Sequence, residues 1–221
     1  MKHSSQRMDI RQNIKAIPSH VGQRERADLL RQEPVTIWFT GLSASGKSTL
    51  AYALERDLVT CGHPCYVLDG DNVRDRLNCD LGFSEEDRTE NIRRVAEVAA
   101  LMNDAGLIVI TALISPKRAD REMAREIIGC DRFLEVYLST PLHECEGRDP
   151  KGLYAKARDG RIQAFTGVSA PYEPPHASGL VLDTAQTGFD ACLTRVKSLV
   201  LPKARHRETF LHGQSAGLCN P

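Results

Sequence analysis

The stretch Gly41-Leu-Ser-Ala-Ser-Gly46-Lys47-Ser48-Thr49 follows directly on an apolar run, Val35 to Phe39, and fits the pattern G-x-x-x-x-G-K-[ST]. Glycines at both ends let successive backbone N–H groups turn toward phosphate oxygens that a Cβ would hold away. Leucines at 50, 54 and 58 have helical spacing, so the positive end of a helix dipole faces the same phosphates. The stretch therefore predicts an ATP or GTP site.

Every residue of this loop is a candidate nucleotide ligand. The set is Gly41, Leu42, Ser43, Ala44, Ser45, Gly46, Lys47, Ser48 and Thr49. Lys47 would place a positive charge at the β- and γ-phosphates, and the Ser48 hydroxyl would ligate the Mg²⁺ that bridges them. A flexible Gly/Ser-rich turn is the alternative, but the strand before the loop and the helix after it disfavour that interpretation.

The composition indicates one globular domain. The chain has 221 residues, 41% hydrophobic and 26% charged, with 29 basic and 29 acidic side chains, so it offers no general basic field for a nucleic acid polymer. No apolar run reaches the length of a membrane span, and the first residues lack the apolar core of a secretory signal, so we expect a cytoplasmic protein. Seven cysteines without a C-x-x-C pair favour reduced thiols over disulfides or a zinc site.

Apolar segments alternate with helical patterns after residue 34. Continuous apolar runs predict strands at residues 35–39, 66–69, 107–113, 133–138 and 180–182. The clearest helix begins at Ser84, with Asp87 giving an approximate capping box, and stops at Gly106, while another ends at Gly129. Buried strands separated by helices predict an α/β fold, a doubly wound parallel five-stranded sheet with helices on both faces.

We expect three regions along the chain. Residues 1–33 form an N-terminal arm with a short charged helix, residues 34–201 form the domain, and residues 202–221, which are polar and aperiodic, form a disordered tail. Between the fourth and fifth strands, residues 148–175 are rich in charge, Gly and Pro, which predicts a mobile lid that closes over phosphates. A solvated surface segment is the alternative for this region.

Phosphoryl transfer to an alcohol needs more than a phosphate loop. Polar residues follow the strand ends, where ligands gather in parallel sheets. Asp71, just after the second strand, could take the acceptor's proton or organise Mg²⁺, and Arg74, one helical turn on, could bind an anionic group. Alternatively, Asp71 caps a helix and Arg74 is a surface residue.

The segment from residue 81 to 94 has the features of a receptor for a flat anionic molecule. Arg88 and Asn91 are three apart on a helical pattern, so both can face one ligand. Phe83 and Phe165 lie near glycines in loops, which favours stacking on a base over burial in the core. An exposed charged helix face is the alternative.

Together these motifs resemble the adenylylsulfate kinases, which phosphorylate the 3′-hydroxyl of adenosine 5′-phosphosulfate (APS) with ATP. The matching elements, in the family's order, are Phe39-Thr-Gly-Leu-Ser-Ala-Ser-Gly-Lys-Ser, Leu68-Asp-Gly-Asp-Asn-Val-Arg74, Leu81-Gly-Phe-Ser, Glu90-Asn-Ile-Arg-Arg94, Ala105-Gly-Leu-Ile-Val-Ile-Thr-Ala-Leu-Ile-Ser-Pro116, Arg148-Asp-Pro-Lys-Gly-Leu-Tyr154, Phe165-Thr-Gly167 and Pro171-Tyr-Glu173. The resemblance implies a P-loop kinase fold and an ATP-dependent, Mg²⁺-requiring adenylylsulfate kinase of sulfate assimilation.

The resemblance also implies roles for individual residues. APS would be held by Asp71, Arg74, Phe83, Arg88, Asn91, Ile114, Ser115 and Phe165, with its adenine between the two phenylalanines. Arg148 and Lys151 match lid residues near ATP. Ser115 matches a serine described in this family as a phosphorylated intermediate, yet in-line transfer between two bound nucleotides needs no protein nucleophile, so a hydrogen bond to substrate is the simpler role. The candidate catalytic residues are Lys47, Asp71 and Ser115.

A few positions depart from the family's pattern. Ala44 replaces a usual glycine, which is a mild change provided that its φ is negative. Lys117 stands where an aromatic is common, and the arm around residues 13–17 follows the pattern only in part. The resemblance further implies a homodimer and a functional link to an ATP sulfurylase.

Three other functions compete with this one. A kinase of another small alcohol is possible, although small sugars need no paired aromatics. A GTP-dependent switch is disfavoured because the chain has no Asn-Lys-x-Asp motif. A catalytically silent nucleotide-binding module is disfavoured by the intact Lys47, Ser48 and Asp71.

Overall fold

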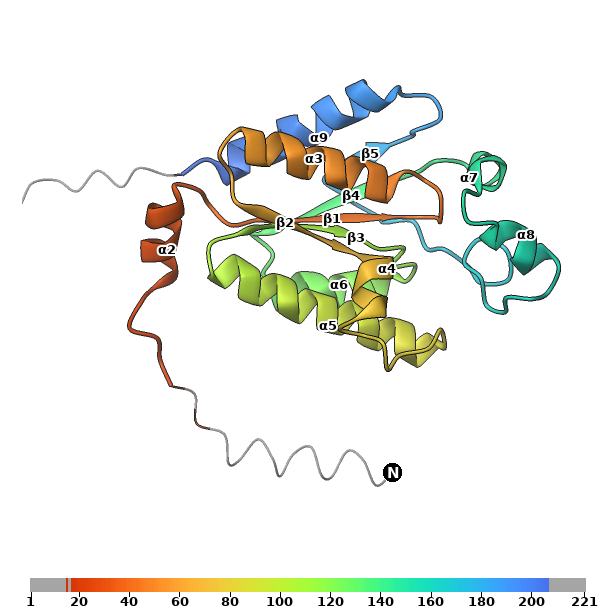
Figure 1. Ribbon diagram of the computed structural model, residues 1–221, viewed down its shortest axis with the longest axis horizontal. Helices are drawn as coiled ribbons and strands as arrows, with labels where there is room; N and C mark the ends of the chain where they lie inside the picture. The colour runs from red at the N-terminus through yellow and green to blue at the C-terminus, as the bar shows by residue number, and fades with distance from the viewer. Residues whose placement is uncertain (1–14, 16, 207–221) are drawn as a thin grey trace, which may run out of the picture.

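The computed structural model describes residue 15 and residues 17–206. These residues form a five-stranded sheet in the order β2-β3-β1-β4-β5, and every neighbouring pair is parallel (Figure 1). The strands are β1 (Thr36–Gly41), β2 (Cys65–Asp69), β3 (Ile108–Ala112), β4 (Phe133–Leu138) and β5 (Leu180–Leu182). The predicted doubly wound parallel sheet is confirmed, and each predicted strand ends within about two residues of the observed one.

Helices cover both faces of this sheet. One face carries α3 (Lys47–Thr60) and α9 (Phe189–Ala204), and the other carries α4 (Gly70–Asp75), α5 (Glu85–Asp104) and α6 (Arg118–Ile128) (Figure 1). The helix α2 (Gln23–Leu30) precedes β1, and α7 (Leu142–Arg148) and α8 (Leu153–Arg158) lie beyond the strand ends. Because α3 and α6 leave the neighbouring strands β1 and β3 toward opposite faces, the sheet has a switch point between those strands, where such folds bind ligands.

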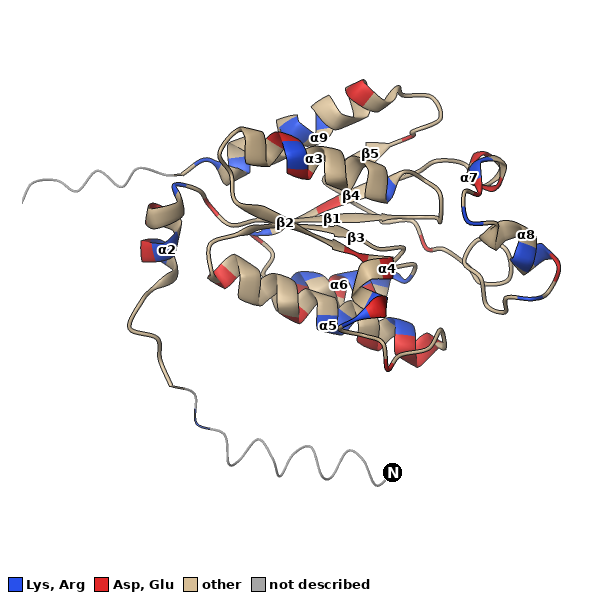
Figure 2. Ribbon diagram, viewed as in Figure 1, with Lys and Arg blue, Asp and Glu red and all other residues tan. Residues whose placement is uncertain are grey.

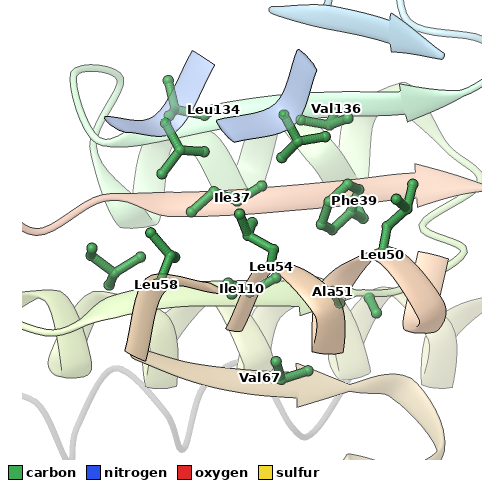
Figure 3. Close-up of a cluster of buried hydrophobic side chains, with 14 of the residues drawn as sticks. Ile37, Phe39, Leu50, Ala51, Leu54, Leu58, Val67, Ile110, Leu134 and Val136 are labelled. Atoms are coloured by element: carbon green, nitrogen blue, oxygen red, sulfur yellow. The ribbon is translucent and has the colours of Figure 1, made fainter. Parts of the chain in front are cut away.

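One hydrophobic cluster fixes α3 on the sheet. Leu50, Leu54 and Leu58, which the sequence placed on one helical face, are buried against Ile37 and Phe39 of β1 (Figure 3). Since α3 begins at Lys47, immediately after the phosphate loop, this packing also fixes the end of the helix that faces the loop. The core on this face therefore holds the phosphate loop in place.

A second cluster fixes α5 on the opposite face. Ile92, Val95 and Ala99, which share one face of α5, are buried beside Trp38 of β1. The predicted cap of this helix is confirmed, because the Ser84 hydroxyl accepts from the backbone N–H of residue 87 at 3.1 Å. The carboxylate at position 87 accepts instead from the N–H of residue 82 at 3.0 Å, so it orders the loop before the helix.

The last helix is longer than predicted. The sequence placed the start of a disordered tail at residue 202, but α9 continues through Pro202 to Ala204. Tertiary contacts explain this extension, because Ala204 is buried in the first cluster and its carbonyl accepts from the N–H of Glu33 at 3.0 Å. The predicted tail from residue 207 and the predicted arm up to residue 14 lie outside the described residues.

The predicted lid, residues 148–175, has a small apolar cluster of its own. Tyr154 of α8 and Phe165 are buried with Cys145 of α7, and the two aromatic rings pack edge to face at 5.0 Å. In Figure 1 the helices α7 and α8 stand beside the carboxyl end of β1, away from the two main helix layers. This packing places the segment over the strand ends where the sequence predicts phosphates.

Charged residues of both signs are interspersed along the helices, while the central strands carry few charges (Figure 2). No helix in the part of the chain that the structure describes is long and apolar enough to cross a membrane.

Candidate active site

A cavity of about 1200 Å³ lies at the carboxyl ends of the strands. It is lined by the phosphate loop, the turn after β2, the start of α5, the segment after β3 and the predicted lid. The cavity brings together most of the predicted site residues: Ser43, Ala44, Gly46, Lys47, Ser48, Thr49, Asp71, Arg74, Phe83, Arg88, Asn91, Ile114, Ser115, Arg148, Lys151 and Phe165. Gly41, Leu42 and Ser45, also predicted as ligands, do not line it.

Two of these residues, Gly41 and Ser45, support the loop from behind. Gly41 has φ 145°, and a Cβ there would lie 2.6 Å from the carbonyl oxygen of Leu138, so only glycine allows β1 and β4 to approach so closely. Ser45 is fully buried, and its carbonyl accepts from the hydroxyl of Thr184 at 2.9 Å. The loop is thus anchored to the residues that follow β5.

Ala44 has a backbone conformation that the sequence did not predict. Its φ is +58°, in the left-handed region, where a Cβ crowds the carbonyl oxygen. The expectation that alanine is a mild replacement for glycine depended on a negative φ and is therefore wrong. Alanine at this position strains the phosphate loop.

The Lys47 ammonium group is buried and bonded to its own loop. Only 7% of the residue is exposed, and Nζ donates to the carbonyl oxygens of Gly41 at 3.0 Å and Leu42 at 2.6 Å. Burial lowers the pKa of Lys47 from 10.5 to about 8, partly offset by the nearby carboxylates of Asp69 and Asp71. The loop carbonyls hold the ammonium group at the loop, where it could also donate to a phosphate oxygen.

Ser48 is paired with a carboxylate that sequence reasoning did not assign to the site. The Ser48 hydroxyl donates to Asp69 Oδ2 at 2.6 Å, and Asp69 Oδ1 accepts from the N–H of Asp71 at 3.0 Å. Asp69 is therefore the cap of α4, which excludes the alternative that Asp71 plays this role. The available signal was the position of Asp69 as the last residue of a buried strand, directly opposite the phosphate loop.

Asp71 and Arg74 extend from α4 toward the lid and the acceptor end of the cavity. The Asp71 carboxylate forms an ion pair with Lys151 of the lid. The Arg74 guanidinium lies 4.5 Å above the Phe83 ring and donates to the carbonyl of Gly82 at 2.7 Å. Burial lowers the pKa of Arg74, and the neighbouring charge of Arg88 adds to the shift. Two cations therefore stand together at this end of the cavity, next to an aromatic face.

Arg88 connects the two predicted stacking residues. Its Nε donates to the carbonyl of Phe83 at 3.0 Å, and its two terminal nitrogens donate to the Thr166 hydroxyl at 3.0 Å and the Ala164 carbonyl at 2.7 Å, on either side of Phe165. Phe83 is 66% exposed, with the Arg74 guanidinium over its ring, whereas Phe165 is 8% exposed and packs in the lid cluster. The expectation that Phe165 would not be a core residue is therefore wrong. One guanidinium thus holds both aromatics at the same cavity.

Asn91 is oriented by a buried neighbour that the sequence did not reveal. Its Oδ1 accepts from Nδ2 of Asn78 at 2.9 Å, and Asn78 is fully buried. Asn91 lines the cavity, and because its oxygen is engaged by Asn78, its amide nitrogen is the group that can donate to a ligand.

The Ser115 hydroxyl belongs to a buried hydrogen-bond network. It accepts from Nε1 of Trp38 at 3.1 Å and donates to the Thr40 hydroxyl at 3.0 Å, and the residue is 2% exposed. A hydroxyl held on both sides in this way is poorly placed to attack a phosphate, which favours a structural role over a covalent one. The carbonyl of Ile114 also joins the network, because it accepts from the Thr40 hydroxyl at 2.8 Å.

Arg148 reaches the base of the phosphate loop through Thr184, a second residue that sequence reasoning missed. Its guanidinium donates to the Thr184 hydroxyl at 2.8 Å and to the Thr184 carbonyl at 3.1 Å. The start of the predicted lid is therefore attached to the loop that binds phosphates.

Replacement of Ala44 by glycine is expected to stabilise the protein. Relief of the left-handed strain contributes about 1–2 kcal/mol, and the greater freedom of glycine in the unfolded chain removes about 0.5–1 kcal/mol, so the free energy of unfolding should increase slightly. Urea unfolding measures the change. Ala53→Gly, inside α3, makes the same chemical change and should destabilise by about 1 kcal/mol. Equal destabilisation by both variants would contradict the strain at Ala44.

The pKa of Lys47 predicts a pH-dependent stability. Because the folded pKa lies below the unfolded one, the folded protein binds fewer protons between pH 8 and 10.5, so its stability rises with pH across this window. Lys47→Met removes the effect. Between pH 7 and 10 the free energy of unfolding of the unliganded wild type should therefore rise by roughly 2 kcal/mol relative to that of the variant. Denaturant titrations measure this difference, and Lys156→Met, at an exposed position of α8, is the control. A difference between wild type and Lys47→Met that stays constant with pH would contradict the prediction.

Comparison with known proteins places this geometry in a family. The family model described as adenylylsulphate kinase matches residues 33–183. The adenylyl-sulfate kinase of Bacteroides thetaiotaomicron is 58% identical over 181 residues, 82% of this chain and 90% of that protein. Among solved structures, the Mycobacterium tuberculosis APS kinase CysC in complex with AMPPNP and APS has 48% identity and a TM-score of 0.73, covering 76% of this chain and 98% of that one.

A hexameric APS kinase from Thiobacillus denitrificans is also similar, with 29% identity and a TM-score of 0.60, covering 80% of this chain and 30% of that one. On the family model, the extent of the match and the identity to its relatives, the chain belongs to the adenylylsulfate kinase family.

Proposed function

We propose that the protein transfers the γ-phosphate of ATP to the 3′-hydroxyl of APS, giving 3′-phosphoadenosine 5′-phosphosulfate and ADP. The main observation in support of this function is a single cavity that is lined at one end by most of the phosphate loop and at the other by paired aromatics, arginines and an amide. The mycobacterial relative, at 48% identity, holds an ATP analogue and APS together. The enzyme is therefore an ATP-dependent kinase of a nucleotide acceptor.

The donor end binds the triphosphate of ATP. The N-terminus of α3 and the loop N–H groups face the phosphates, and Lys47 adds a positive charge at the β- and γ-phosphates. The Ser48 hydroxyl and the Asp69 carboxylate, whose oxygens are 2.6 Å apart, would hold Mg²⁺, which prefers oxygen ligands. When bound, Mg²⁺ would neutralise part of the charge on the phosphates.

The acceptor end binds APS. Phe83 and Phe165 would stack on the adenine, and Arg74 and Arg88 would attract the phosphosulfate, while the Asn91 amide donates one directional hydrogen bond. Burial lowers the pKa of Arg88, although both arginines remain charged at neutral pH. The two ends together fix the acceptor hydroxyl relative to the γ-phosphate, which is the main requirement of phosphoryl transfer.

Asp71 is a carboxylate that lines the cavity, and we propose that it takes the proton of the acceptor hydroxyl. The 3′-oxygen attacks the γ-phosphorus, the bond from that phosphorus to the bridging oxygen of ADP breaks, and the hydroxyl proton passes to Asp71. Lys151, paired with Asp71 in the unliganded protein, would exchange that partner for ATP phosphates, which frees Asp71 for the hydroxyl.

A panel of acceptors tests this function. ADP formation from ATP and Mg²⁺ should be orders of magnitude faster with APS than with gluconate, shikimate or nucleoside monophosphates. Lys47→Ala should lower the turnover with APS by orders of magnitude while the circular dichroism spectrum stays unchanged. Equal rates of ADP formation with all acceptors would show that APS is not the specific acceptor.

Arg88→Ala should weaken binding at the APS site and leave the ATP site nearly unchanged. Loss of three charge-assisted hydrogen bonds around the paired aromatics is expected to raise the KM for APS at least tenfold, with the KM for ATP changed less than about twofold. Steady-state kinetics with each substrate varied measures both constants. Arg93→Ala, on the same helix but paired at the surface with Glu90 and Glu97, is the matched control. An effect confined to ATP would place the acceptor site elsewhere.

The proposal also covers the oligomeric state of the protein, its functional partner and its location in the cell. A homodimer, a functional link to an ATP sulfurylase and a cytoplasmic location fit the family, and light scattering of the purified chain tests the first of them. The similar hexameric protein from Thiobacillus denitrificans makes a larger assembly the main alternative outcome.

A further inference from the structure

Arg121 is a buried cation that the proposed reaction does not yet use. It lies on α6 and is 3% exposed, although it does not line the cavity. A buried guanidinium is stable only when charges and acceptors surround it, so its partners indicate what it holds in place.

Its three partners come from three different parts of the chain. Nε donates to the Glu135 carboxylate of β4 at 2.7 Å, one terminal nitrogen donates to the Ser115 carbonyl at 2.6 Å, and the other donates to the Glu173 carbonyl at 2.7 Å. Glu135 neutralises the charge, and the two carbonyls fix the direction of the planar guanidinium fork. Arg121 therefore joins the segment after β3 to the segment in which the predicted lid returns to the sheet.

Further bonds connect the same two segments. The N–H of Glu173 donates to the Pro116 carbonyl at 2.9 Å. The Tyr172 hydroxyl is 2.8 Å from the Thr40 hydroxyl, which in turn accepts from Ser115. The Arg121 guanidinium lies 5.7 Å from the centre of the Tyr172 ring. The lid is thus anchored at residues 172 and 173 to the wall of the cavity, and Arg121 lies at the centre of that anchor.

The wall held in this way has an unfavourable backbone conformation. Ser115 has φ +39°, in the left-handed region that residues with a Cβ avoid, and its carbonyl is the one that Arg121 binds. Ile114, Ser115 and Pro116 line the cavity, and the first two are predicted to contact APS. Without a strong donor on that carbonyl, the segment can relax to an ordinary conformation and change the shape of the acceptor site.

We propose that Arg121 is a positioning residue for the acceptor: it holds Ser115 and Glu173 in one arrangement and so determines how APS is bound, while the ATP site stays independent of it. This inference rests on the proposed function, and it predicts an effect on one substrate of the two. The phosphate loop is held mainly by α3, by Leu138 at the end of β4 and by Thr184 after β5, and Arg121 forms hydrogen bonds to none of these. The segment that Arg121 binds reaches the loop through one long bond, from the Gly41 N–H to the Ile114 carbonyl at 3.4 Å.

Arg121→Lys is the main test. Lysine retains a positive charge beside Glu135 but cannot direct three bonds as a planar fork does. The KM for APS should rise at least tenfold, while the dissociation constant for ATP, measured by calorimetry, should change less than twofold. Arg125→Lys, one turn further along α6 and paired with Glu122 at the surface, should change neither value more than twofold.

Chemical rescue separates positioning from general stability. Arg121→Ala leaves a space for a guanidinium ion, so guanidinium at millimolar concentration should restore part of the APS-dependent turnover, and the same salt should not raise the activity of Arg125→Ala. If Arg121→Ala does not fold, Arg121→Lys decides the question alone. Folded Arg121→Lys with an unchanged KM for APS, or with equal losses for ATP and APS, would overturn the proposal. Absence of APS-dependent turnover in the wild type would instead reject the proposed function.

Discussion

The close approach of β1 to β4 at Gly41 is the constraint on which the rest of the structure depends. A Cβ at this position would collide with the Leu138 carbonyl oxygen at 2.6 Å, so the strand can end here only as glycine. From this point the loop turns back, and α3 starts at Lys47 with its leucines fixed against the same strand (Figure 3). The hydrophobic core therefore determines where phosphates bind, because it determines where β1 ends and α3 begins.

The charged groups of the site are all satisfied within the protein before any ligand binds. Lys47 is bonded to loop carbonyls, Asp71 is paired with Lys151, and the donors of Arg88 are directed to carbonyls beside the aromatics. Binding of two anionic nucleotides then exchanges partners instead of filling a site with bare charges, which limits the desolvation cost of the empty site. Part of the desolvation cost remains at Lys47, because burial lowers its pKa and so disfavours the charged form in the absence of a phosphate.

The sequence predicted the features that local patterns encode. Continuous apolar runs gave the five strands, and Ser84 gave the start of α5, since one buried face and one side-chain cap suffice for each. Features that depend on distant contacts were missed: Thr184 contacts Ser45 across 139 positions, and Asn78 orients Asn91 from a loop without a motif. The positive φ of Ala44 and the extension of α9 past Pro202 also follow from packing that no local window contains.

The same distinction separates the two halves of the site. The donor half is one continuous segment, so a nine-residue motif specifies both its shape and its chemistry. The acceptor half is assembled from α4, α5, the segment after β3 and the predicted lid, and none of these specifies the position of the others. Two buried or half-buried guanidinium groups fix these segments relative to one another. Arg88 joins the aromatics, and Arg121 joins the cavity wall to the anchor of the lid. Because a planar fork with several fixed donors can hold separate backbone segments at one distance, arginine is suited to this task, and we propose that specificity for the acceptor depends on it.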